Sequence, residues 1–133
     1  MGKAAAFVSA KSRLDKLGAK PGLRIAILNL DDAVFVAELE DSGARLCEAA
    51  AGLDLLFYGA DSPAELAAIG DLAPLLADRG ALWVISLKGR LARIRDVEVM
   101  AAAKAHGLVD TKVCAFSETR TALKLVRRRA PTG

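Results

Sequence analysis

The sequence predicts an α/β fold built on a doubly wound, mostly parallel sheet that a C-terminal antiparallel hairpin completes. Between residues 23 and 107, continuous aliphatic runs alternate with helix-like segments, as expected for strands buried on both faces and covered by helices. The composition is 53% hydrophobic but only 5% aromatic, which indicates an aliphatic core. A chain of 133 residues has the size of one domain, so we expect a single domain over 1–133.

The first elements follow from apolar periodicity. Residues 4–17 have the pattern of an amphipathic helix, and LRIAILNL (23–30) reads as a central strand that opens a core of about 22–128. Residues 31–40 favour a short helix, although their Val-Phe-Val run also suits a strand. Residues 129–133 form a loose basic tail in this interpretation.

Two strands and a capped helix are expected next. Residues 44–48 suggest a short strand, and LDLLFYG (53–59) predicts a buried one. In the following helix, Ser62 is the expected cap, and Glu65 reaches back to it. We expect this helix to pause at a glycine, to resume with Asp71 as a second cap, and to end at Arg79-Gly80.

The last third contains the clearest strand, ALWVISL (81–87), followed by a basic loop. Asp96 is the expected cap of a helix that ends at His106-Gly107. Residues 111–116 and 120–127 then form the predicted hairpin around a polar turn.

Charge is distributed in blocks. Residues 1–24 carry six basic and one acidic side chain, residues 25–78 one basic and eleven acidic, and residues 79–133 twelve basic and four acidic. Such alternation fits either ordinary solvated surface or a self-complementary assembly, and we expect a homodimer. No run is long enough to span a bilayer, so no membrane contact and a cytoplasmic location are expected.

Several common chemistries have no signature here. A Walker loop, a GxGxxG, an HExxH and a GxSxG are all absent from the sequence. Cys47 and Cys114 lie in apolar stretches without metal-ligand spacing and read as buried thiols. The single histidine, His106, suits a helix C-terminus, where the dipole favours a cation. No metal site is predicted.

Two stretches fall where open α/β sheets bind ligands, at the carboxyl ends of strands. Asn29, Asp31 and Asp32 follow the first strand, and the two aspartates suit either ligand contacts or the start of a helix. The stronger candidate is an anion site in the basic loop after the 81–87 strand. Its proposed members are Ser86, Lys88, Gly89, Arg90 and Arg93. The alternative is a solvated basic face.

The order of elements resembles the class I methyltransferase core, a Rossmann-like fold. KLGAKPGLRIAILN is similar to the lead-in and first strand of that family, and GLVDTKVCAFSETRTALKLVRR to its terminal hairpin. One strand–helix unit of that family is absent after ARLCE, so the resemblance implies a truncated version of the fold. The whole chain also resembles a small bacterial family defined only as a domain of unknown function.

The resemblance implies an acidic residue for ribose hydroxyls at the end of the second strand, where Glu48 stands. The turn from Asn29 to Ala33, however, lacks the glycines that let backbone approach the cofactor in that family. We therefore expect no cofactor and, in particular, no binding of S-adenosylmethionine.

The favoured function is a non-catalytic, methyltransferase-like domain that binds an anionic small molecule or a protein partner. A divergent S-adenosylmethionine-dependent methyltransferase is the first alternative. A nucleic-acid-binding accessory protein is the second, disfavoured because the middle of the chain is acidic and no aromatic residues are interleaved with the basic tail.

Overall fold

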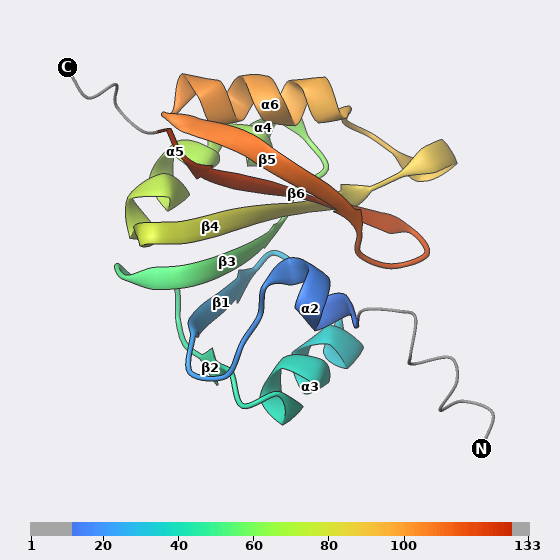
Figure 1. The fold of residues 1–133 in the computed structure, drawn as a ribbon. Helices are drawn as coiled ribbons and strands as arrows, with labels where there is room; N and C mark the ends of the chain where they lie inside the picture. Colours follow the sequence, from blue (N-terminus) through green and yellow to red (C-terminus); the bar gives the residue numbers. More distant parts are fainter. Residues whose placement is uncertain (1–11, 129–133) are drawn as a thin grey trace.

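The computed structural model describes residues 12–128, and within them six strands form one sheet in the order β2-β1-β3-β4-β6-β5 (Figure 1). The strands are β1 (Arg24–Leu28), β2 (Arg45–Leu46), β3 (Leu53–Gly59), β4 (Leu76–Leu87), β5 (Leu108–Ala115) and β6 (Arg120–Arg127). Strands β1 to β4 are parallel, and β6 is antiparallel to both of its neighbours. The predicted fold class is confirmed, including the hairpin and the shortened β2 side of the sheet.

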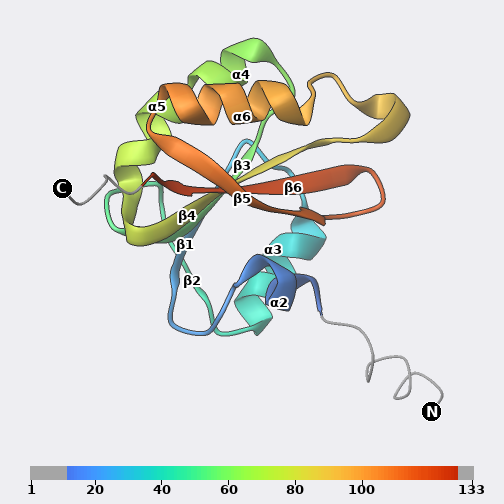
Figure 2. The same ribbon diagram turned by 45° about the horizontal axis from the view of Figure 1, so that its top comes forward.

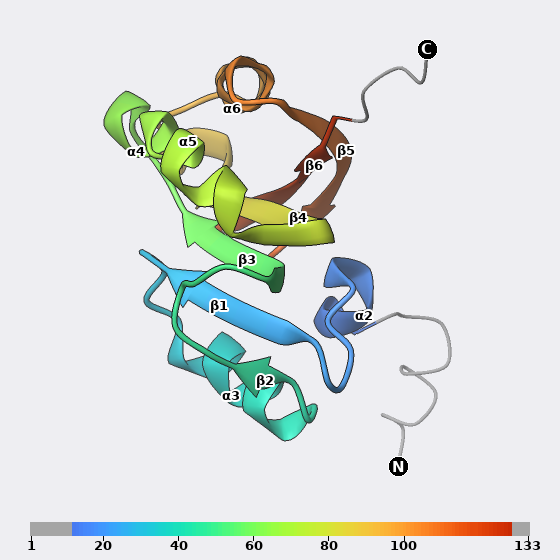
Figure 3. The ribbon, with the colours of Figure 1, turned by 90° about the vertical axis from the view of Figure 1, so that its left-hand side faces the viewer.

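Helices cover both faces of the sheet, as a doubly wound fold requires (Figures 2 and 3). The helices are α2 (Arg13–Leu17), α3 (Ala33–Asp41), α4 (Pro63–Ala67), α5 (Ile69–Leu72) and α6 (Asp96–Ala105). Helices α2 and α3 lie on one face, and α4, α5 and α6 lie on the other. Each face has its own cluster of buried aliphatic side chains, which explains why the strands read as continuous apolar runs. In the described residues, no helix is long and apolar enough to cross a membrane.

Two helix starts have the side-chain caps that the sequence predicts. The Asp32 carboxylate accepts a hydrogen bond from Phe35 N at 3.0 Å, which settles residues 33–41 as helix. Ser62 Oγ accepts from Glu65 N at 3.1 Å at the start of α4, and Pro63 occupies the first turn, where its missing N–H removes no helical bond.

The N-terminal helix is described from Ser12 onward, so residues 4–11 of the prediction lie outside the described part, as does the 129–133 tail. The Arg13 guanidinium pairs with Glu38 at 2.7 Å and lies 4.7 Å from the centre of the Phe116 ring. Trp83 Nε1 donates to Leu17 O at 3.1 Å. These contacts fix α2 against α3 and the sheet.

Three predicted boundaries are wrong. Arg79-Gly80 does not end a helix, because β4 already begins at Leu76. A Cβ on Gly80 would lie 2.4 Å from Leu53 O, so this glycine serves the close approach of β4 to β3. Asp71 lies inside α5 and does not cap it, since the cap residue is Ala68. β2 comprises only two of the five residues predicted for it.

Candidate functional site

The carboxyl ends of β1, β3 and β4 meet at one edge of the sheet, since these strands are parallel neighbours. From β1 the chain passes to β2 on one side and then to β3 on the other, so the strand order reverses between β1 and β3. Open α/β sheets bind ligands at such a reversal. The polar side chains along this edge are therefore the candidates for function.

Asn29 joins the ends of β1 and β3. It has φ of +54°, the left-handed conformation that asparagine tolerates better than most residues. Its Nδ2 donates to Gly59 O at 2.7 Å and to the Glu65 carboxylate. A Cβ on Gly59 would lie only 2.1 Å from Asn29 O, so the two strand ends can approach this closely only with glycine at 59.

Glu65 is the centre of this network. Beyond the predicted capping contact with Ser62, its Oε1 accepts from Asp61 N at 2.8 Å. The hydrogen bond from the Asp61 backbone lowers the pKa of Glu65, and those from Asn29 and Ser62 add to this effect against partial desolvation. The sequence revealed Glu65 only as a capping residue. Its contact with Asn29, 36 positions away, had no local signal.

The network extends to β4 through Asp61. Its Oδ1 accepts from Leu87 N at 2.8 Å, at the last residue of β4. Tyr58, next to Gly59, donates its hydroxyl proton to Glu65 O at 2.8 Å, and burial raises the pKa of this phenol. The ends of three parallel strands are thus linked by hydrogen bonds.

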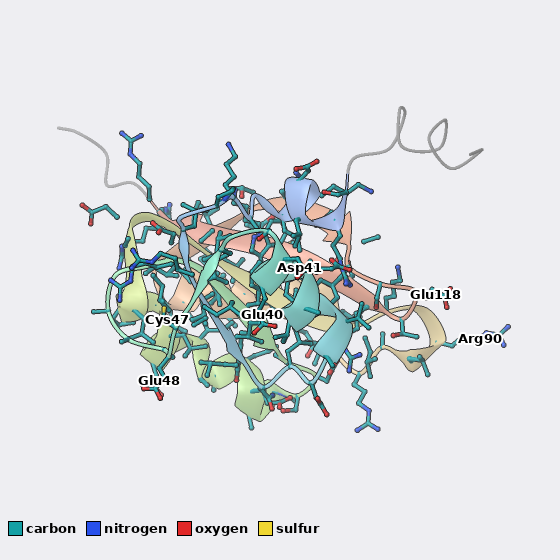
Figure 4. All side chains as sticks on the ribbon, turned by 90° about the horizontal axis from the view of Figure 1, so that it is seen from below. Glu40, Asp41, Cys47, Glu48, Arg90 and Glu118 are labelled. Atoms are coloured by element: carbon teal, nitrogen blue, oxygen red, sulfur yellow. The ribbon has the colours of Figure 1, made fainter. Side chains whose placement is uncertain are left out.

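A cavity of about 460 Å³ lies where β1 and β2 end. It is lined mainly by apolar side chains of these two segments and by Glu48, whose carboxylate is exposed (Figure 4). The lining residues are Ile27, Leu28, Leu46, Cys47, Glu48 and Ala49. An apolar wall with one carboxylate suits a flat ring carrying hydroxyl groups.

A second cavity, of about 430 Å³, lies where β4 ends and α6 begins. Lys88, Gly89 and Arg95 line it, together with Thr121 of β6. Gly89 has φ of +63° and starts a 3₁₀ turn, Gly89–Leu91. This is the predicted basic loop, and Figure 4 shows Arg90 at its tip, far from Glu48.

The predicted site residues therefore fall into two groups. Lys88 and Gly89 share one cavity, beside exposed Arg90 and Arg93, while Ser86 lies buried in β4 with 4% of its surface exposed. Asn29, Asp31 and Asp32 lie at the end of β1, which β3 separates from β4. Asp32 is used as the cap of α3.

Arg95, absent from the predicted set, lines the second cavity. Asp96 is not the cap of α6: the cap residue is Arg95, whose N–H donates to Glu98 Oε1 at 3.0 Å. The apolar periodicity before α6 is weak, so the sequence did not show which of these two adjacent residues is the N-cap.

The remaining reactive side chains have local explanations. His106 ends α6, and its ring packs beside Gly70, where a Cβ would lie 2.6 Å from it. Cys47 and Cys114 are free and only half-buried, so their prediction as buried thiols is corrected. Desolvation raises the pKa of Cys114. Among residues 12–128, no three His, Cys, Asp or Glu side chains gather as metal ligands.

Comparison with solved structures identifies the same fold in S-adenosylmethionine-dependent methyltransferases. The ribosomal protein L11 methylase of Lactobacillus delbrueckii subsp. bulgaricus superposes with a TM-score of 0.64 at 12% identity, over 88% of this chain and 76% of that one. Magnesium protoporphyrin IX methyltransferase of Synechocystis, with bound SAM, gives 0.64 at 14% identity, over 86% and 74%. A SAM-dependent methyltransferase of Aquifex aeolicus gives 0.62 at 11% identity, over 92% and 96%. These likenesses establish a methyltransferase-like fold.

No protein-family model matches the chain, and a search of curated proteins also finds no match.

The prediction of no cofactor, with S-adenosylmethionine excluded, is wrong. Solved structures of this fold include SAM-dependent methyltransferases of Corynebacterium glutamicum and Aquifex aeolicus, and the Synechocystis enzyme has SAM in one structure and SAH in another. The turn after β1 lacks glycine, but Asn29 adopts a left-handed φ there. The glycine that permits the close approach of the two strand ends is Gly59 on the neighbouring strand.

Proposed function

We propose that this chain is a divergent methyltransferase-like domain that binds S-adenosylmethionine along the carboxyl edge of β2, β1 and β3. The observation that carries the proposal is the position of Glu48, which follows β2 on an apolar cavity beside the end of β1. Strand-end carboxylates of this kind can accept hydrogen bonds from ribose hydroxyls.

Different residues of the site would contact different parts of the ligand. Glu48 would hold the ribose, and the apolar side chains of the cavity, such as Ile27 and Leu46, would contact the adenine. The turn at Asn29, kept in place by Gly59 and Glu65, would lie against the amino-acid portion. When bound, S-adenosylmethionine supplies an electrophilic methyl group.

Isothermal titration with S-adenosylmethionine and S-adenosylhomocysteine tests the proposal. The wild type should bind both, and Glu48→Gln should weaken binding about tenfold, because a carboxylate is a stronger acceptor than an amide. Glu40→Gln is the matched control, since Glu40 is also exposed but lies on α3 and lines neither cavity (Figure 4). Absence of binding by the wild type, or equal weakening in both variants, would reject the proposal.

A further inference from the structure

The cavity at the end of β4 combines several donors that suit one anion. Lys88 and Arg95 line it from two sides of the basic loop, and the first residues of α6, Asp96 and Val97, line it as well. The Glu98 side chain accepts from Arg95 N, and the N–H groups of Asp96 and Val97 are the ones that lack an intrahelical acceptor. Asp96 also brings a carboxylate to the rim. Lysine and arginine side chains and free N–H groups at a helix start are donors that commonly bind phosphate.

The cations of the loop are poorly neutralised. Within the described residues, Lys88, Arg90 and Arg93 have no carboxylate within ion-pair distance, and Arg95 reaches Glu98 only at 3.9 Å with 81% of its side chain exposed. A contact of that length on the surface offsets little charge. The loop therefore keeps an excess of positive charge around the cavity.

Ser86 precedes Leu87, which lines the cavity. It is the single buried polar residue among those described, at 4% exposure. It lies directly opposite Thr121 on the sheet, and Thr121 lines the cavity. Ser86 does not itself line the cavity, so it is not among the donors of the site.

We propose that this cavity binds the phosphate group of a small phosphorylated molecule, the second ligand beside the proposed S-adenosylmethionine. Lys88, Arg95 and the first N–H groups of α6 hold the phosphate. The role as second ligand rests on the proposed function, but phosphate binding does not require it. The lining of the cavity contains no aromatic side chain on which a nucleic-acid base could stack, which favours a small molecule over RNA.

The two sites lie along one edge of the sheet and are linked by hydrogen bonds. Asp61 accepts from Leu87 N, the residue before Lys88, and Asp61 N in turn donates to Glu65, which binds Asn29. Because neighbouring strands lie about 4.8 Å apart, the end of β4 is about 10 Å from the end of β1. A small molecule held by its phosphate at β4 would therefore reach toward a ligand over β1 and β3.

The test uses inorganic pyrophosphate as the probe, with thermal unfolding and titration calorimetry in low salt. Pyrophosphate should raise the Tm of the wild type, and the Lys88→Ala, Arg95→Ala double variant should bind it at least about tenfold more weakly. Lys20→Ala, Lys104→Ala removes the same charge from exposed positions outside this cavity and should bind like the wild type. Ser86→Ala should leave pyrophosphate binding nearly unchanged, because Ser86 does not line the cavity.

S-adenosylmethionine titration of the same variants separates this inference from the proposed function. Unchanged S-adenosylmethionine affinity in the Lys88, Arg95 variant supports two distinct sites. If the wild type binds S-adenosylmethionine but not pyrophosphate, the phosphate site is wrong and the proposed function stands. If pyrophosphate binds and S-adenosylmethionine does not, the proposed function fails, whereas the anion site is supported by itself. Equal loss of pyrophosphate in both double variants, or tight binding of a single-stranded RNA that pyrophosphate does not displace, overturns the small-molecule site.

Discussion

Two stretches of the same sheet edge differ in how completely their polar groups are paired. At the ends of β1 and β3, Asn29, Asp61 and Glu65 satisfy one another and the strand termini. At the end of β4, Lys88 and its neighbours are exposed or half-exposed with few partners. Paired groups hold the architecture, whereas unpaired ones remain available for a ligand. Mutations should therefore affect stability at the first stretch and binding at the second.

The largest effect is expected from Gly59→Ala. The added Cβ would lie 2.1 Å from Asn29 O, a backbone atom that cannot rotate away, so the ends of β1 and β3 must separate. We expect a loss of about 3 kcal/mol or more in the free energy of unfolding, measured by urea denaturation. A loss below about 1 kcal/mol would show that the turn at Asn29 is free to move.

Glu65→Gln should cost about 1–2 kcal/mol, because it weakens the hydrogen bonds from Asp61 N and Asn29 while retaining the shape of the side chain. A double-mutant cycle with Asn29→Ala measures the coupling, which we expect to be favourable and above about 0.5 kcal/mol. Additive effects would mean that the contact between Asn29 and Glu65 does not link the strands.

The same carboxylate predicts a pH dependence. The folded pKa of Glu65 lies below its ordinary value of 4.5, so the ionised form contributes stability that is complete above pH 4.5 and is lost as the pH falls through the folded pKa. Urea midpoints between pH 3 and 7 should therefore fall on the acid side more steeply in the wild type than in Glu65→Gln. Parallel profiles would contradict the assignment.

Gly89→Ala should have a smaller effect on stability than Gly59→Ala. Nothing lies within 4 Å of the position of the new Cβ, and the cost comes from the positive φ of +63° alone. About 1 kcal/mol is expected. The comparison of the two alanine variants in one denaturation series separates steric contact from backbone conformation.

The smallest effect on stability is expected at the exposed cation Arg90. Arg90→Ala should change the free energy of unfolding by less than about 0.5 kcal/mol, because its side chain has no ion-pair partner among the described residues. A larger loss, by thermal or urea unfolding, would mean that the basic loop has an architectural role like that of Glu65.

The sequence alone determined the fold class and most of its elements. The continuous runs of β1, β3 and the second half of β4 identify buried parallel strands, because such strands lack a polar face. Two of the local caps were also predicted correctly: Asp32 and Ser62 bond to N–H groups three residues away, a distance that sequence spacing fixes. The predicted caps Asp71 and Asp96 were wrong. The basic loop was also visible as a run of cations after a strand.

Only the tertiary structure decided the rest, because the deciding contacts join residues distant in sequence. From the sequence, Gly80 looks like the end of a helix. In the structure, a Cβ on Gly80 would lie 2.4 Å from Leu53 O. From the sequence, Asn29 is a bulky residue in a turn without glycine. In the structure, it has a left-handed φ and hydrogen bonds to Gly59 and Glu65. Propensity describes what a residue prefers by itself, and packing at the strand ends determines which conformation it adopts.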